Sequence, residues 1–334
     1  MSTSSAMKIS PRDSQAIHLL RVVAMLSVMA AHVNRIIAES TTIDLYITRF
    51  WNAFGTVGVA VFLILGGLVY HRQPGDELAF WGKKLHRLIV PWLFCATLTY
   101  LLSALLSRKI SCLVYIRWVL GMGTWYYYIS VFLIFLYAFK WIEKSNIALG
   151  GCMLLTLLSL TLEYFQVIPH NSFFTKYVNV FNWIGFFAVG CAIRKIGLET
   201  VRFFLTQKAT MCVAGILFLL LLCFILQMKE FSYFTPLAFL WELIVFGVLF
   251  QLSWFAVQGR IGKWMSSLGG LTYCIYLIHM QFVQILCAKM PKTTLFWILN
   301  PVIAMVAITA AVYCFDFLCS RFLFGGKIKR LVGL

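Results

Sequence analysis

Ten apolar runs follow one another along this chain of 334 residues, and most are close to the length of about 20 residues that a helix needs to cross a bilayer. The runs cover residues 15–37, 51–70, 88–107, 124–141, 147–163, 177–193, 209–228, 235–256, 266–288 and 294–318. Only short connectors separate them, so we expect no separate soluble domain. Because hydrocarbon cannot satisfy free backbone polar groups, the pattern predicts an all-α polytopic membrane protein of about ten transmembrane helices.

The composition also indicates that the chain lies in a lipid bilayer. Charged residues make up only 12% of the sequence, against about 25% in soluble domains. The net charge of +17 does not predict a nucleic-acid partner, because the Lys and Arg residues form short clusters between the apolar runs. The ten cysteines include no C-x-x-C pair and none beside a histidine at ligand spacing, so we expect neither a metal site nor a disulfide framework.

The distribution of positive charge predicts the orientation. If the N-terminus is cytoplasmic, the inner connectors and tails carry twice as many Lys and Arg residues as the outer connectors. This asymmetry follows the positive-inside rule and places both termini in the cytoplasm. The expected organisation is a cytoplasmic tail at residues 1–14, a transmembrane domain at 15–320 and a basic cytoplasmic tail at 321–334.

The first apolar run contains two ionisable residues, Arg21 and His32, which are eleven positions apart. Eleven helical steps make about three full turns, so both side chains project from one helix face, roughly 16 Å apart along the axis. Charged residues inside a span mark functional sites by default. The alternative is that Arg21 extends to the lipid headgroups while His32 bonds a carbonyl group.

Two further ionisable residues fall at a similar predicted depth. Glu242 in the eighth run and His279 in the ninth are both expected in the outer half of the bilayer, close to the level of His32. One interpretation is a polar site shared by the three residues, and the alternative for Glu242 is a structural hydrogen bond. Glu163 lies at the end of a run, where we expect a solvated or capping role.

The connector before the third run is the most basic segment of the chain. It carries His71, Arg72, Lys83, Lys84, His86 and Arg87. Lys84 and Arg87 are three positions apart, so in a helix they share a face and can grip one polyphosphate. The alternative is that the segment only anchors the chain at the cytoplasmic surface.

Five motifs occur in order over nearly the whole chain. They are Arg21-x10-His32, VGVAVFLILGGLVY from Val57, KKLHRLIVPW from Lys83, WYYYISVFLIFLY from Trp125 and LTYCIYLIH ending at His279. In this order they resemble the acyltransferase-3 family, polytopic membrane enzymes that O-acylate bacterial surface glycans. The chain departs from the family pattern at His18, where an acidic residue is common, at Gly66, which replaces a serine, and at Lys84, which replaces an arginine.

The resemblance implies transfer of an acyl group, most simply acetyl, from cytosolic acyl-CoA to a hydroxyl of a cell-envelope glycan or lipid-linked saccharide at a bacterial inner membrane. The CoA thioester is then a co-substrate, and no permanently bound cofactor is expected. The implied roles are catalytic for His32, Arg21 and Glu242, acyl-CoA binding for Arg21, Lys84 and Arg87, and acceptor binding for Trp125, Tyr126 and His279. In these roles His32 is the base that takes the hydroxyl proton. The alternative for Trp125 and Tyr126 is a place in the aromatic belt at the membrane interface.

Two questions stay open on the sequence alone, the route of the acyl group and whether the protein is an enzyme. The acyl group can pass directly from CoA to the acceptor or rest first on His32 as an acyl-imidazole. A multispan transporter or a non-catalytic membrane protein would also contain apolar spans with a few charges. Transporters usually carry Gly- or Pro-broken spans in corresponding halves, and no such pair is evident here.

Overall fold

The computed structural model describes residues 9–33, 41–72, 75, 77–228, 231–289, 293–321 and 325–334, and all regular structure in these ranges is helical. The helices are α1 (Pro11–Val33), α2 (Thr42–Gly55), α3 (Val57–Leu68), α4 (Glu77–Lys84), the π-helix η2 (Leu85–Ile89), α5 (Val90–Ser107), α6 (Cys112–Val119), α7 (Tyr127–Ile142), α8 (Asn146–Tyr164), the 3-10 helix η3 (Val180–Asn182), α9 (Ile184–Ile196), α10 (Leu198–Leu205), α11 (Lys208–Gln227), α12 (Pro236–Ala256), α13 (Arg260–Ser267), the 3-10 helix η4 (Leu268–Gly270), α14 (Thr272–Lys289), α15 (Thr294–Cys319) and α16 (Gly325–Leu331).

Each of the ten predicted runs coincides with a helix, although fewer than ten helices in the described residues are long enough to cross a bilayer alone. In the described residues, seven helices are long and apolar enough to cross a membrane. An eighth span is possible if α13 with η4 and α14, which meet at a bend of 79°, form one span. The runs at 124–141 and 177–193 fall on α7 and α9, which have only 16 and 13 residues. Residues 34–37 of the first run, 1–8 of the N-terminal tail and 322–324 of the C-terminal tail lie outside the described residues.

The outward-facing surfaces of the long helices are apolar. Leu105 and Leu106 on α5 and Leu219 and Leu220 on α11 are among many exposed large hydrophobic side chains. In α11, only 6% of the most apolar 18-residue window is buried. Helices with such faces need lipid around them, since water-soluble monomers rarely expose large continuous apolar patches. The chain is therefore a multi-pass integral membrane protein.

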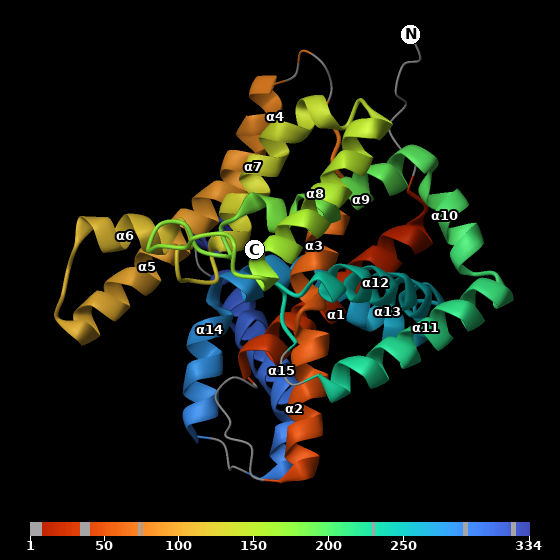
Figure 1. Cartoon of the computed structure of the whole chain (residues 1–334). Helices are drawn as coiled ribbons and strands as arrows, with labels where there is room; N and C mark the ends of the chain where they lie inside the picture. The colour runs from red at the N-terminus through yellow and green to blue at the C-terminus, as the bar shows by residue number, and fades with distance from the viewer. Residues whose placement is uncertain are drawn as a thin grey trace.

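Helix α1 lies at the centre of the fold and carries both Arg21 and His32. It packs against α2, α3, α12, α13, α14 and α15, and Figure 1 shows it between α5 and α6 on one side and α10 and α11 on the other. Its start is fixed by Ser10, whose hydroxyl accepts the Asp13 N–H at 3.1 Å, and by Pro11 in the first turn. Most residues from Ala16 to Val33 are buried, so this helix belongs to the core of the protein and does not face lipid.

Glycines allow α3 and α9 to cross at very short range. A Cβ atom at Gly67 would lie 2.1 Å from the Phe187 carbonyl oxygen, and one at Gly190 would lie 2.0 Å from the Ile64 carbonyl oxygen. Both distances are too short for any side chain. Small residues at such crossings let two backbones approach inside a membrane, and this crossing holds α3 against the rest of the core.

The π-helix η2 joins α4 to α5 within one candidate span, 77–107. The Val90 N–H bonds the Leu85 carbonyl, five positions back. Pro91 follows and has no N–H to offer the Arg87 carbonyl, so the regular i to i−4 ladder is interrupted here. Single π turns of this kind occur often at functional sites, and this one carries His86 and Arg87.

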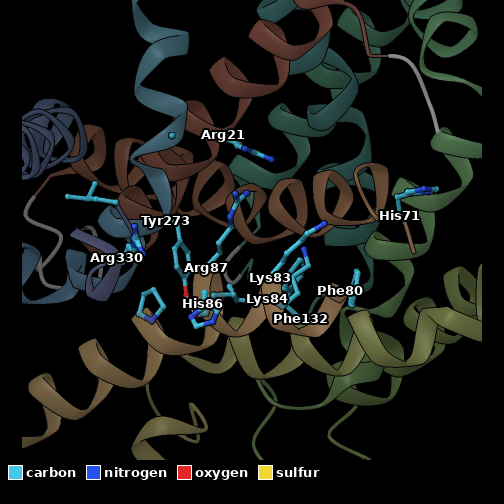
Figure 2. Close-up of a pocket in the computed structure, with 15 residues that line it drawn as sticks. Arg21, His71, Phe80, Lys83, Lys84, His86, Arg87, Phe132, Tyr273 and Arg330 are labelled. Atoms are coloured by element: carbon cyan, nitrogen blue, oxygen red, sulfur yellow. Dashed lines mark hydrogen bonds between the residues drawn. The ribbon is translucent and has the colours of Figure 1, made fainter. Parts of the chain in front are cut away.

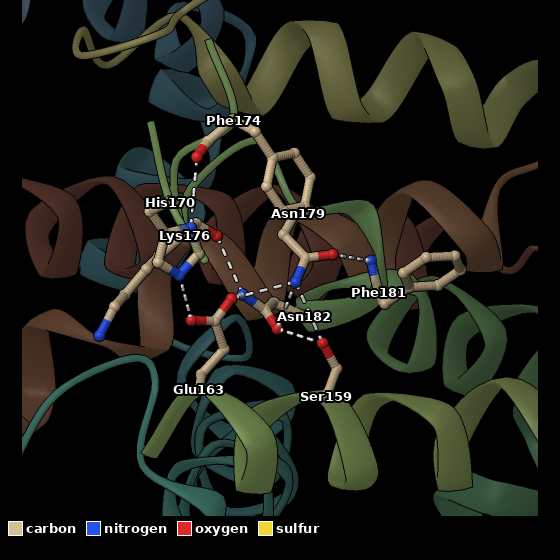
Figure 3. Close-up of polar contacts among 8 residues, drawn as sticks. All are labelled: Ser159, Glu163, His170, Phe174, Lys176, Asn179, Phe181 and Asn182. Carbon is tan, nitrogen blue, oxygen red and sulfur yellow. Dashed lines mark hydrogen bonds and ion pairs between the residues drawn. The ribbon is translucent and has the colours of Figure 1, made fainter. Parts of the chain in front are cut away.

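A buried polar network anchors the segment between α8 and α9 (Figure 3). The Glu163 carboxylate accepts the side-chain amides of Asn179 and Asn182 at 3.0 and 3.1 Å and pairs with His170 Nε2 at 2.6 Å. Ser159 joins through a 2.6 Å bond to Asn182. The Glu163 side chain is fully buried, so the expectation of a solvated or capping role is wrong: the amides and the imidazole replace water as its partners.

Candidate active site

One cavity of about 1210 Å³ lies at the junction of α1, α4, η2, α7, α14 and α16. It is lined by Arg21, His71, Phe80, Lys83, Lys84, His86, Arg87, Leu88, Pro91, Phe132, Gly270, Tyr273, Arg330, Gly333 and Leu334. We call it the cationic cavity. Figure 2 shows Arg21 on one wall, Lys83, Lys84 and Arg87 across from it, and His71 and Arg330 toward the two ends.

The charge on this cavity has one sign. Its lining includes five Lys and Arg side chains and two histidines, and no Asp or Glu side chain from the described residues. Concave sites with cations of one sign focus the field and attract anions. The volume and the number of cations fit a ligand with several phosphate groups, since arginine and lysine are the usual phosphate partners.

Helix α4 and η2 place three of the cations on the cavity through local contacts. Glu77 at the start of α4 pairs with Arg72 at 3.1 Å and with Lys140 of α7, which ties this segment to the core. The Lys84 ammonium lies 5.4 Å from the centre of the Phe80 ring, a cation–π contact one turn back. At the other end of the segment, the Tyr273 hydroxyl of α14 donates to the Leu88 carbonyl at 2.6 Å.

The C-terminal helix α16 adds a cation that the sequence analysis did not assign to the site. Lys329 pairs with Asp316 of α15 at 2.7 Å and bonds the Ser320 hydroxyl at 2.6 Å. These contacts fold α16 back against α15, and the next residue, Arg330, lines the cationic cavity. The only sequence signal was the basic run KIKR, which is equally typical of a membrane anchor.

A second cluster surrounds His32 at the other end of α1. The His32 and His279 ring centres are 5.1 Å apart, and the His279 ring lies 6.1 Å from Trp125 and 5.5 Å from Tyr276. We call these four residues the histidine cluster. The first run, the WYYY motif and the last motif of the sequence thus meet at one place, through α1, the start of α7 and α14.

The hydrogen bonds of His279 fix which ring nitrogen carries the proton. Its Nδ1 lies 2.6 Å from the Tyr276 carbonyl oxygen, which can only accept, so Nδ1 is the donor. Nε2 then presents a lone pair, and it has no hydrogen-bond partner within the described residues. The ring is fully buried and has no carboxylate among its ring contacts. The neutral tautomer with an accepting Nε2 is therefore the form that this site stabilises.

Trp125 and Tyr126 differ in burial and in their hydrogen bonds. The Tyr126 side chain is fully buried, and its hydroxyl donates to the Leu277 carbonyl at 3.0 Å. Trp125 is half-buried, its carbonyl accepts the Tyr276 hydroxyl, and its indole N–H has no partner within the part of the chain that the structure describes. The Trp125 indole N–H is thus buried beside the histidine cluster without a geometric hydrogen bond, whereas Tyr126 braces α7 against α14.

Aromatic rings connect the cationic cavity to the histidine cluster. Phe132, which lines the cavity, stacks on Tyr128 at 5.7 Å between ring centres, and Tyr128 meets Tyr276 at 5.5 Å. Tyr276 in turn contacts His279. Helix α1 also connects the two sites, since its Arg21 lines the cavity and its His32 contacts His279. The two sites are therefore two ends of one region enclosed by α1, α7 and α14, with Tyr128 and Tyr276 between them.

Glu242 lies on α12, away from the ring contacts of His279. Its side chain is buried beside Thr56, at the break between α2 and α3, and one carboxylate oxygen has no partner among the described residues. The neighbouring Trp241 donates to the Ala53 carbonyl at 2.8 Å at the same break. The structure thus brings Arg21, Lys84 and Arg87 together and His32, Trp125 and His279 together, and it places Glu242 with the α2–α3 break.

This arrangement combines a cation-lined cavity, a column of aromatic rings and a pair of imidazoles among the packed helices. Neither the curated proteins nor the solved structures that we searched contain a significant match to the chain. A family model described as an acyltransferase domain matches residues 14–320, which is most of the sequence. The chain therefore belongs to the acyltransferase-3 family and is a membrane acyltransferase.

Proposed function

We propose that this protein transfers an acetyl group from cytosolic acetyl-CoA to a hydroxyl of a cell-envelope glycan on the outer side of a bacterial inner membrane. The observation that carries the proposal is the cationic cavity, where Arg21, Lys84 and Arg87 converge from two separate segments with Lys83 and Arg330 beside them. CoA carries a diphosphate and a further phosphate, and these groups cannot enter hydrocarbon. A cavity with five cations and no acidic side chain from the described residues supports binding of such a donor.

Arg21 has a different position from the other cations. It belongs to α1, the helix that continues to His32, and it lies on the wall opposite Lys84 and Arg87 in Figure 2. We assign Arg21 to binding of the acyl donor, where it contacts the part of the CoA molecule that lies deeper in the cavity than the phosphates. Lys84 and Arg87, on the α4–η2 segment, hold the phosphates.

His32 acts as the base in this proposal. The oxygen of the acceptor hydroxyl attacks the thioester carbonyl carbon, its proton passes to His32, and the carbon–sulfur bond breaks to release the CoA thiol, which takes up a proton. Proton transfer of this kind contributes about 10²–10⁴-fold to a rate. Trp125, with its indole N–H, and His279, with its Nε2 lone pair, bind the acceptor beside His32. Both residues lie within the histidine cluster.

Glu242 and Tyr126 take supporting roles. Burial of the Glu242 carboxyl group next to the α2–α3 break supports a part in holding the helices around His32, which is an indirect contribution to catalysis. Tyr126 supports the acceptor site by fixing the start of α7 through its bond to Leu277.

The test is transfer of labelled acetyl. Inverted membrane vesicles that contain the protein are incubated with [14C]acetyl-CoA, and the glycan fraction is analysed by scintillation counting and mass spectrometry. We expect an added mass of one acetyl group with the wild type and none with His32→Ala. Absence of acetylated glycan in vesicles from cells that make the envelope glycans, with the protein folded and present, would reject the proposal.

A further inference from the structure

Four tyrosines lie where α7 and α14 meet, at the cationic cavity, at the histidine cluster or between them, and three of them have their hydroxyl groups occupied. Tyr126 donates to the Leu277 carbonyl, Tyr273 to the Leu88 carbonyl and Tyr276 to the Trp125 carbonyl. These bonds brace one helix against another and leave the three phenols no proton for a substrate. The fourth tyrosine is Tyr128.

Tyr128 differs from the other three in its contacts. Its ring packs between Phe132 of the cavity wall and Tyr276 of the histidine cluster. Its hydroxyl makes no hydrogen bond to any residue that the structure describes, and the residue is half-buried. The Arg21 guanidinium acts electrostatically on the phenol. Tyr128 thus presents a free O–H donor, within the electrostatic influence of Arg21, between a ring of the cavity wall and a ring of the histidine cluster.

We propose that the Tyr128 hydroxyl donates a hydrogen bond to the carbonyl oxygen of the acyl donor and stabilises the oxyanion that forms there, with the Arg21 charge supporting it. The inference rests on the proposed function. The CoA phosphates lie in the cationic cavity and the base is His32, so the thioester must pass the layer that Tyr128 and Tyr276 form. Of these two phenols, Tyr276 already donates to a backbone carbonyl.

The chemistry of the step balances without further groups. As the acceptor oxygen bonds to the carbonyl carbon, the carbonyl electron pair moves onto oxygen, and the acceptor proton moves to His32. The Tyr128 phenol is protonated at neutral pH and keeps its proton while it donates to this oxygen. When the carbonyl re-forms, the carbon–sulfur bond breaks, and the sulfur takes the proton from His32. Removal of one preorganised oxyanion donor typically lowers kcat about 10²–10³-fold.

The experiment measures the bound thioester directly. The protein in lipid nanodiscs is mixed with acetyl-CoA labelled with 13C at the carbonyl carbon, and the carbonyl stretch is recorded by infrared difference spectroscopy. A hydrogen bond lowers this frequency relative to free acetyl-CoA. The variants are Tyr128→Phe and the control Tyr100→Phe. Tyr100, on α5, also loses one phenol hydroxyl, which donates to the Ser111 carbonyl, and it belongs neither to the cavity lining nor to the histidine cluster.

We expect the wild type and Tyr100→Phe to show the lowered frequency and Tyr128→Phe to lose it. Tyr128→Phe should also lose about 10²-fold in kcat. Its dissociation constant for acetyl-CoA should rise by no more than about tenfold, the effect of one lost hydrogen bond, and this retained binding shows that the variant is folded. If the wild type binds acetyl-CoA with an unshifted carbonyl, or if Tyr128→Phe keeps the shift, the role of Tyr128 is refuted and donor binding stands. If the wild type does not bind acetyl-CoA, the proposed function fails, and the Tyr128 assignment fails with it.

Discussion

Replacing Lys84 and Arg87 together with alanine should weaken acetyl-CoA binding by about 60- to 700-fold. Lys84 is half-buried on the cavity wall, so a charge-assisted contact from it to a phosphate contributes about 1.5–3 kcal/mol. Arg87 is exposed at the surface of η2, and solvent screening reduces its contribution to about 1 kcal/mol. The sum is about 2.5–4 kcal/mol, and each 1.4 kcal/mol is tenfold in affinity.

The assay is equilibrium binding of [14C]acetyl-CoA to the protein in nanodiscs at low and moderate salt. The matched control is Lys208→Ala with Arg260→Ala, which removes the same two charges from exposed positions outside the cavity lining. We expect the control to bind within about threefold of the wild type, because solvent and salt screen exposed charges that do not line the cavity. Equal weakening by both double variants would show that only the net charge matters and would refute the cavity as the phosphate site.

The same comparison with dephospho-CoA identifies which cations hold which phosphate. If Lys84 and Arg87 contact the ribose phosphate that dephospho-CoA lacks, the double variant should bind dephospho-CoA as weakly as the wild type does. If they contact the diphosphate, the variant should lose affinity for both compounds by the same factor. Arg330, the cation contributed by α16, is the natural third variant in this series.

Three more outcomes are expected. His32→Ala should insert and fold but lose at least about 10²-fold in acetyl transfer, measured with [14C]acetyl-CoA, and a near-normal rate would remove His32 from catalysis. Gly67→Val should lower unfolding free energy by about 3 kcal/mol or more, because its Cβ would lie 2.1 Å from the Phe187 carbonyl oxygen, whereas Gly150→Val has open space; equal melting temperatures would contradict the tight α3–α9 crossing. A reporter fused after Leu334 should be active only in the cytoplasm, and periplasmic activity would reverse the predicted orientation.

The helical period explains why the sequence predicted the common face of Arg21 and His32. Arg21 and His32 are eleven residues apart on one uninterrupted helix, so their shared face followed from helix geometry alone. The membrane class followed from the length of the apolar runs, and the family from five ordered motifs. The runs at 124–141 and 177–193 were already at the short end of the range for a span, and α7 and α9 are shorter still, with 16 and 13 residues.

The sequence did not predict contacts between distant segments. Arg330 lines the cavity because α16 packs back against α15 and α5, with Lys329 paired to Asp316. Glu242 was expected at the depth of His279, but depth does not specify the face of a helix, and the structure puts it beside Thr56. Tyr128 stands out only once the hydrogen bonds of its three neighbouring tyrosines are known.

The most direct test of the account is a structure of the protein with a hydrolysis-resistant acetyl-CoA analogue in which oxygen replaces the thioester sulfur. The account predicts density for the nucleotide between Arg21, Lys84 and Arg87 and for the acetyl carbonyl at Tyr128, on the path to His32. Density for the nucleotide outside the cationic cavity, or an acyl arm that leads away from α1, would contradict it.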